Sequence, residues 1–218
     1  MTDTAMYNLT PNKIWRLRKP ESFEVLDGVM LGDGNLSKPA VNACLRYGKS
    51  GNDHIDLVHY VKEQLEEIGV VFASNMPKAL TDENLWLSSR VHIILTGEYF
   101  RWYHNGKKEV PEDILLSPRT LAVLFMDDGS STYSHKSGPT VTVYLATHSF
   151  SEYSIKLLEK ALLLKGINTG RDHDKRVKGG AGIYITILQD SVDLFMSTVS
   201  PYVFPSYQYK IKYRRQQA

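Results

Sequence analysis

Two copies of one nine-residue pattern, each ending in an acid followed by glycine, constrain this chain more than any other feature. Residues 26–34 read LDGVMLGDG and residues 121–129 read LAVLFMDDG, so the two starts lie 95 residues apart. The copies share leucine, aspartate and glycine at their first, eighth and ninth positions, with apolar side chains at the fourth to sixth. Two matched helices that each present an acid at the C-terminal end can bring two carboxylates together. Because such carboxylates repel each other, the pair favours a bound divalent metal.

The two halves of the chain resemble each other beyond the motif. Each motif is followed by a strand-like run, an amphipathic helix that stops at glycine plus a β-branched residue, a second strand-like run and a last helix. In the first half these are residues 43–47, 54–68, Gly69-Val70, 85–94 and the region of Phe100; in the second they are 140–146, 151–164, Gly166-Ile167, 182–188 and the region of Phe195. A Ser117-Pro118 pair also predicts the start of the second motif helix. Each half is therefore expected to fold as helix, two strands, helix, two strands, helix.

Composition sets the broad class of the protein. The 218 residues suit one large domain or two small ones, and a hydrophobic content of 42% is ordinary for a globular protein. No apolar run approaches the length of a membrane span, and the N-terminus does not have the layout of a signal peptide. Cys44 is the only cysteine, which excludes an internal disulfide or a thiolate cluster. We expect an intracellular protein, in the cytoplasm of a bacterium or archaeon, in a phage-infected cell or in the organelle that encodes it.

Basic residues gather near both ends of the chain. The formal net charge is only +2, but residues 13–19 and 210–215 each carry four lysines or arginines and no acid. Such patches indicate contact with a polyanion, although solvated tails would look the same. We predict a basic extension over residues 1–20, a first subdomain over 21–112, and a second over 113–218 that ends in a basic tail.

The first motif also carries glycines that allow close helix packing. Gly28 and Gly32 are four residues apart and so lie on one helix face, where the second motif helix can approach. Val123 and Asp127 stand at the equivalent positions of the second copy, so the interface is expected to be asymmetric. Oxygen-only ligation is typical of magnesium, and the carbonyls of Gly32 and Asp127 could complete a shell begun by the two acids. Either copy alone would also fit a common turn or helix exit.

At these residues the chain resembles the LAGLIDADG homing endonucleases, specifically the monomeric class with two motifs. NGKKEVP at 105–111, His148-Ser149-Phe150 and YVFPSYQYK at 202–210 extend the resemblance over about residues 20–210. It implies an α+β fold of two pseudo-symmetric αββαββα subdomains, whose antiparallel sheets form a saddle over the DNA major groove with the motif helices at the centre. Asp33 and Asp128 would each serve one DNA strand around Mg²⁺, for which Mn²⁺ is a plausible substitute.

The resemblance further implies one basic residue near each acid. The matching positions are Lys108 and Lys210, which would stabilise phosphate charge or orient the attacking water; Lys107 is an alternative to Lys108. Adding 95 to 108 gives 203 rather than 210, so the two lysines are equivalent only if the backbone routes differ between the halves. A lysine that is simply exposed, whether it touches phosphate or makes no contact, would give the same sequence pattern.

Polar residues of the predicted strands and the tail are candidates for DNA contact, because a major groove displays distinguishable base edges. They could equally form the solvated face of each sheet. The candidates are Arg46, Lys49, Ser88, Arg90, His92, Arg171, Lys175, Arg176, Tyr184, Thr186, Lys212 and Arg214. The histidines show no ligand spacing, and we predict no zinc site.

The function expected from this resemblance is a monomeric, site-specific endonuclease. It would hydrolyse one phosphodiester in each strand of a long duplex DNA target. Because the two halves differ in sequence, the target should be asymmetric rather than palindromic. Two alternatives stay open: an RNA-binding splicing maturase, and a catalytically silent DNA-binding relative.

Overall fold

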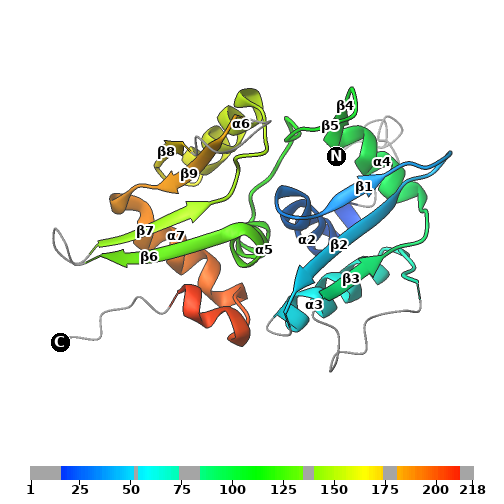
Figure 1. The fold of residues 1–218 in the computed structure, drawn as a ribbon, viewed down its shortest axis with the longest axis horizontal. Helices are drawn as coiled ribbons and strands as arrows, with labels where there is room; N and C mark the ends of the chain where they lie inside the picture. The colour runs from blue at the N-terminus through cyan, green and yellow to red at the C-terminus, as the bar shows by residue number, and fades with distance from the viewer. Residues whose placement is uncertain (1–15, 52–53, 74–83, 135–139, 174–180, 212–218) are drawn as a thin grey trace, which may run out of the picture.

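The computed structural model describes residues 16–51, 54–73, 84–134, 140–173 and 181–211. At its centre, two helices that carry the repeated motifs pack against each other: α2 (Pro20–Leu31) and α5 (Pro118–Asp128). An antiparallel sheet lies on either side of this pair, one from each half of the chain (Figure 1). The predicted α+β fold with central motif helices is confirmed.

The sequence signals around α5 explain how this helix begins. The Ser117 hydroxyl accepts a hydrogen bond from the Thr120 amide at 3.1 Å, and Pro118 occupies the first turn. This is the predicted N-cap followed by proline. Every residue from Thr120 to Asp127 is buried, because α5 is covered by α2, by its own sheet and by the last helix of its half.

The first sheet has the strand order β1-β2-β3, with β1 at Asn35–Ser37, β2 at Cys44–Ser50 and β3 at Asn84–Ser88. Helices α3 (Ile55–Glu66) and α4 (Ile93–Trp102) belong to the same half. A bridge between Phe72 and Ser89 continues the sheet beyond β3. The strand predicted over residues 85–94 was too long, because α4 begins at Ile93. A hairpin of β4 (Tyr103–His104) and β5 (Lys107–Lys108) closes this half.

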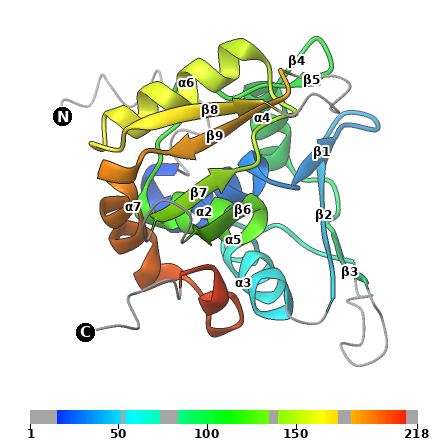
Figure 2. The same ribbon diagram turned by 60° about the vertical axis from the view of Figure 1, so that its left-hand side comes forward.

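The second sheet has the order β6-β7-β9-β8. Its strands are β6 (Gly129–Ser134), β7 (Thr140–Leu145), β8 (Thr169–His173) and β9 (Ile183–Ile187), with α6 (Glu152–Leu163) and α7 (Val192–Val199) in the same half (Figure 2). Three short 3₁₀ segments, Gln189–Ser191, Ser200–Tyr202 and Pro205–Lys210, flank α7. The N-cap of α6 is Ser151, whose hydroxyl accepts a hydrogen bond from the Ser154 amide at 3.2 Å.

The helix stops that marked the duplication have the same geometry in both halves. Gly69 and Gly166 adopt the left-handed φ values of 84° and 77° that glycine tolerates. The next amide in each case, of Val70 or Ile167, donates to the carbonyl five residues back at 3.1 Å. The match is not complete, because Phe195 of α7 is buried whereas Phe100 of α4 is 61% exposed.

Gly28 is one of the positions where the two halves approach each other closely. A Cβ atom placed on Gly28 would lie 2.6 Å from Cβ of Val123 and 2.9 Å from the carbonyl oxygen of Thr120. The predicted asymmetric contact, glycine against valine, is therefore present. It brings the C-terminal ends of α2 and α5 together. Across the described ranges, no helix combines the length and hydrophobicity needed to cross a bilayer.

Candidate active site at the ends of the paired helices

Three carboxylates gather where the two central helices end. Asp33, Asp127 and Asp128 each offer one oxygen, and these oxygens lie within 4.8 Å of one another. The Asp33 side chain is 51% exposed, Asp128 is half-buried and the Asp127 carboxylate is fully buried. The cluster is therefore open to solvent on the side of Asp33 and closed on the side of Asp127.

Asp127 fixes the position of its neighbours through its side chain. Its Oδ2 accepts a hydrogen bond from the Asp33 amide at 2.7 Å, and its Oδ1 accepts one from the Tyr47 hydroxyl at 2.9 Å. The sequence pointed only to the Asp127 carbonyl. A buried carboxylate needs such partners, because desolvation of a bare charge is costly. The close approach at Gly32 makes room for it, since a Cβ there would lie 1.9 Å from Asp127 Oδ2.

Lys49, a predicted DNA contact, joins this cluster of carboxylates. Its Nζ lies 2.6 Å from Asp33 Oδ2 and 2.5 Å from Asp127 Oδ1, and it donates to the Asp127 carbonyl at 3.1 Å. Burial opposes the charge of Lys49, but the neighbouring carboxylates raise its pKa above the usual value. The ammonium therefore stays charged. A signal existed in the sequence, since Lys49 is in phase with the buried Leu45 and Tyr47 of β2.

Lys108 and Lys210 contact the C-terminal ends of the two motif helices. Lys108 Nζ donates to the carbonyls of Gly32 at 2.9 Å and Gly34 at 3.0 Å. Lys210 Nζ donates to Phe125, Met126 and Gly129 at 3.1, 2.7 and 2.7 Å. Carbonyls at a helix C-terminus attract a cation. The two lysines reach matching places by different routes, one from a hairpin strand and the other from a 3₁₀ segment, while Lys107 is exposed.

Burial shapes the electrostatics of both lysines and of Asp128. Desolvation lowers the pKa of Lys108, and it lowers that of Lys210 to about 8. Desolvation, with the nearby charges of Asp127 and Asp33, raises the pKa of Asp128 to about 7. This crowding of negative charge is what a bound cation would relieve.

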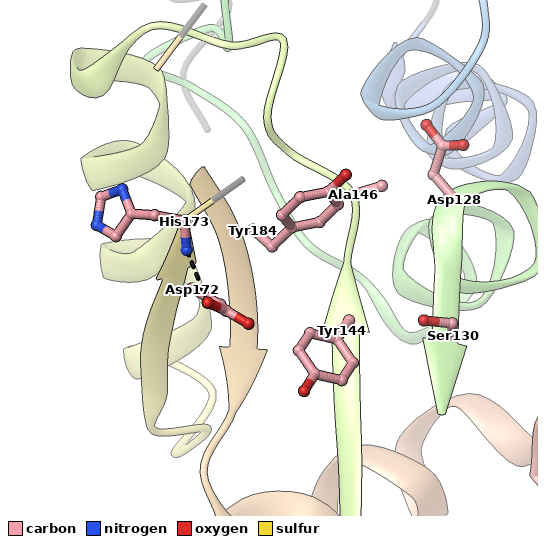
Figure 3. A pocket seen from close by; sticks show the side chains of 7 residues that line it. All are labelled: Asp128, Ser130, Tyr144, Ala146, Asp172, His173 and Tyr184. Carbon is pink, nitrogen blue, oxygen red and sulfur yellow. Dashed lines mark hydrogen bonds between the residues drawn. The ribbon is translucent and has the colours of Figure 1, made fainter. Parts of the chain in front are cut away.

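Asp128 also lines a pocket of about 340 Å³ in the second half, where Tyr144 and Tyr184 project from neighbouring strands (Figure 3). The other lining residues are Ser130, Ala146, Asp172 and His173. The pocket opens on the face of the second sheet that its helices leave uncovered. A group bound there would lie beside the Asp128 carboxylate.

Residues 23–195 match the LAGLIDADG DNA endonuclease family over most of the chain. The chain belongs to this family. Among curated proteins, this LAGLIDADG chain is 28% identical over 200 residues to an uncharacterized protein of Methanocaldococcus jannaschii, covering 86% of this chain and 72% of that protein. It is also 28% identical over 205 residues to the cytochrome b mRNA maturase bI2 of Debaryomyces hansenii, covering 88% and 73%.

A solved structure shares the fold of this LAGLIDADG protein. The homing endonuclease I-WcaI, bound to its DNA recognition sequence, superposes with a TM-score of 0.70 at 21% identity. The superposition covers 96% of this chain and 97% of I-WcaI. The pair of pseudo-symmetric halves around central helices is therefore the LAGLIDADG arrangement.

The remaining predicted DNA contacts of this LAGLIDADG chain fall into three groups. Arg46, Ser88 and Arg90 are exposed on or beside the first sheet, and Tyr184 and Thr186 are half-buried on β9. The side chains of two candidates are engaged within the protein. Arg171 pairs with Glu152 and Glu159 on the helix-covered side of its sheet, and His92 accepts a hydrogen bond from Ile94 as the N-cap of α4. The last group lies outside the described residues: Lys175, Arg176, Lys212 and Arg214.

Proposed function

We propose that this LAGLIDADG protein is a site-specific endonuclease that acts on duplex DNA. It would hydrolyse one phosphodiester in each strand of an asymmetric target, with Asp33 serving one strand and Asp128 the other. The observation that carries the proposal is the convergence of the three acids at the ends of the paired helices, with one lysine at each helix end. A purely structural role would not explain three carboxylates packed against one another, because their repulsion costs stability.

The acids fit a divalent metal such as magnesium. The cluster offers oxygen donors, and the exposed Asp33 and half-buried Asp128 can each present a carboxylate to an incoming ion. The predicted carbonyl ligands, of Gly32 and Asp127, each accept one hydrogen bond from a lysine. Since a carbonyl oxygen has two lone pairs, both could still contribute. Bound metal supplies a more acidic water and charge stabilisation at the phosphate.

The lysines are better placed to hold positive charge than to accept a proton. Lys210 Nζ donates to three carbonyls, which uses all three N–H groups of an ammonium. A neutral amine has only two N–H groups and would direct its lone pair at a carbonyl oxygen. Lys210, and Lys108 in the other half, therefore provide fixed cations beside the point where phosphate charge develops.

The outer faces of the two sheets provide a surface for a duplex. Arg46 and Ser88 are exposed in the first half, and Tyr144, Tyr184 and Thr186 occupy the outer face of the second. Because the two faces differ in side chains, each is expected to contact a different sequence. I-WcaI, which shares the fold, was solved on its DNA recognition sequence.

The test uses the genomic locus around the gene, rejoined without the insertion that carries it. The purified protein and Mg²⁺ are incubated with a supercoiled plasmid bearing this locus. We expect linear product from the native protein. Asp33→Asn and Asp128→Asn should lose cleavage while they keep affinity for the locus. Asp193→Asn, which changes an exposed acid on α7, is the matched control and should cut normally.

Two outcomes would contradict this proposal. Normal cleavage by both Asp33→Asn and Asp128→Asn would exclude these acids from the site. Absence of cleavage by the native protein, together with stimulated splicing of the host intron, would replace the nuclease by an RNA function.

That RNA function is the second candidate, and one observation favours it. The similarity to a maturase, at 28% identity, is as high as the similarity to the uncharacterized archaeal protein. A maturase function predicts tight binding to the transcript of the surrounding intron, and faster self-splicing when the protein is added. Both acids would then be dispensable, so the two Asp→Asn variants would stimulate splicing as the native protein does.

A further inference from the structure

An indole ring stands exposed on strand β3 of the first sheet. Trp86 of β3 is 59% exposed, whereas its strand neighbours Leu85 and Leu87 are buried at 2% and 1%. Trp102 is fully buried. Strand alternation places Trp86 on the outer face of the sheet, together with the exposed Ser88. Because this outer face is the one proposed to meet the DNA duplex, the exposed indole is available to a base edge in the major groove.

The ring is held by the strand beside it. Gly48 of β2 is the cross-strand partner of Trp86, and a Cβ at Gly48 would lie 2.4, 2.7 and 2.8 Å from three atoms of the indole. The backbone of Gly48 does not have a positive φ, so its conformation does not require glycine. Glycine inside a strand weakens it and often marks a close approach. Here it lets the indole lie directly against the backbone of β2.

The position of Trp86 has a counterpart in the second sheet. Arg46 pairs with Asn35 and Ser88, while Tyr144 pairs with Ser130 and Thr186. Asn35 and Ser130 each follow a motif acid by two residues. Trp86 therefore corresponds to Tyr184, two residues before Thr186. Tyr184 lines the pocket beside Asp128 (Figure 3). Each half thus presents one aromatic ring at the same place on its outer face.

We propose that Trp86 contacts the C5-methyl group of a thymine in the target half bound by the first subdomain. This inference rests on the proposed DNA function. In a major groove, the thymine methyl is the apolar group among the base-edge features, and an apolar side chain is its natural partner. Arg46 lies on the same face, opposite Ser88 and two residues along β2 from Gly48, and supplies a cation for a phosphate or a guanine. Tyr184 carries a hydroxyl, so the equivalent base pair of the other half would be read differently.

The experiment has two steps, both in buffer with EDTA so that DNA is not cut. First, the native protein and Trp86→Ala each select duplexes from a library randomised over one half of the target. The native protein should select thymine at one position, where Trp86→Ala should accept any base. Second, that thymine is replaced by deoxyuridine, which lacks only the methyl group. Loss of one buried methyl group should weaken native binding about four-fold.

Further variants keep this test decisive. Trp86→Ala should bind the thymine and deoxyuridine duplexes equally, and Trp86→Phe should retain part of the difference. Phe100→Ala, which removes an exposed ring from α4, is the matched control and should behave as native. Far-UV circular dichroism of Trp86→Ala checks the fold, and Trp86→Phe replaces it if the fold is lost.

The failures are distinguishable. A native protein that selects a specific duplex but shows no Trp86-dependent thymine, or no effect of deoxyuridine, overturns this inference and leaves the DNA function standing. A protein that selects no duplex, but binds single-stranded RNA through Trp86, overturns both.

Discussion

Lys49 Nζ lies 2.5 Å from the buried carboxylate oxygen Oδ1 of Asp127, so this ion pair joins a lysine of the first half to an acid of the second. By strand register, Arg46 corresponds to Tyr144, so Lys49 corresponds to Thr147. Thr147 is a buried residue whose hydroxyl bonds to backbone. Asp33 is therefore paired with a lysine, while the second half has a threonine at the corresponding position. The two motif acids share a plan but differ in surroundings.

The Lys49–Asp127 pair should be strongly coupled in stability. Lys49→Met leaves a buried carboxylate without its cation and should destabilise the fold by about 3 kcal/mol. Adding Asp127→Asn removes the uncompensated charge, so the double variant should be less destabilised than the sum of the single variants, by about 1–3 kcal/mol. Urea unfolding of the native protein and the three variants, near neutral pH and without metal, measures this. Additive effects would show that the pair is not an energetic unit.

When metal is absent, the Asp128 carboxylate should lower the free energy of unfolding above neutral pH. Its pKa is about 7 in the fold against 3.8 for an unperturbed side chain. The folded state therefore holds a proton that the unfolded chain releases first, and stability falls as pH rises between these values. Asp128→Asn removes this loss and should stabilise the protein by about 1–2 kcal/mol near pH 8, a figure reduced for partial exposure. The gain should shrink toward about pH 5. Urea unfolding in EDTA at both pH values tests this, and a gain independent of pH would contradict it.

Gly28 should tolerate no side chain. Alanine in a helix is ordinarily stabilising relative to glycine, but here its Cβ would lie 2.6 Å from Val123 Cβ. We expect Gly28→Ala to destabilise the protein by about 1–3 kcal/mol. Combining it with Val123→Gly exchanges the small and large positions and should recover part of the loss, since the Thr120 carbonyl stays at 2.9 Å. Thermal unfolding compares the variants. A higher melting temperature for Gly28→Ala would mean that the helices can separate without cost.

Arg46 and Arg171 should differ in their contribution to DNA binding. Arg46 is exposed on the outer face of its sheet, whereas Arg171 is held by Glu152 and Glu159 at 2.7 and 2.6 Å. Arg46→Ala should weaken binding and, if it contacts phosphate, reduce the salt-dependence slope by about one. Arg171→Ala should change neither. Affinity for the target duplex over a range of salt concentrations is the measurement. Equal effects of the two substitutions would place the DNA elsewhere.

The ends of several helices could be predicted from the sequence, because they depend on a few neighbouring residues. Ser117-Pro118 begins α5, and Gly69 and Gly166 end the helices before them. Each of these helix ends is determined by residues within about one helical turn. The strand predicted over residues 85–94 was too long, because α4 is capped by His92. Histidine is not a typical N-cap residue, so the sequence did not mark the start of this helix.

The part of the candidate site that lies within the two repeated motifs could be predicted from the sequence. Asp33, Asp128 and the glycine contacts follow from helix periodicity. The side-chain role of Asp127 and the inward position of Lys49 depend on which groups a crowded interior can pair, and Arg171 depends on the glutamates of a distant helix. These contacts form between elements that lie far apart in the sequence, so local sequence signals do not predict them. Alternation along β2 and β3 nevertheless contained the signals for Lys49 and for the exposed Trp86.

The glycine-against-valine contact between α2 and α5 also limits how this protein can be recombined. A hybrid that joins its first half to the second half of a relative would inherit one side of an interlocking surface without the other. Only partners with a side chain of suitable size opposite Gly28, and an acid or smaller group opposite Gly32, should assemble. Swapping halves to change target preference therefore requires matched helix faces before any change of the sheets.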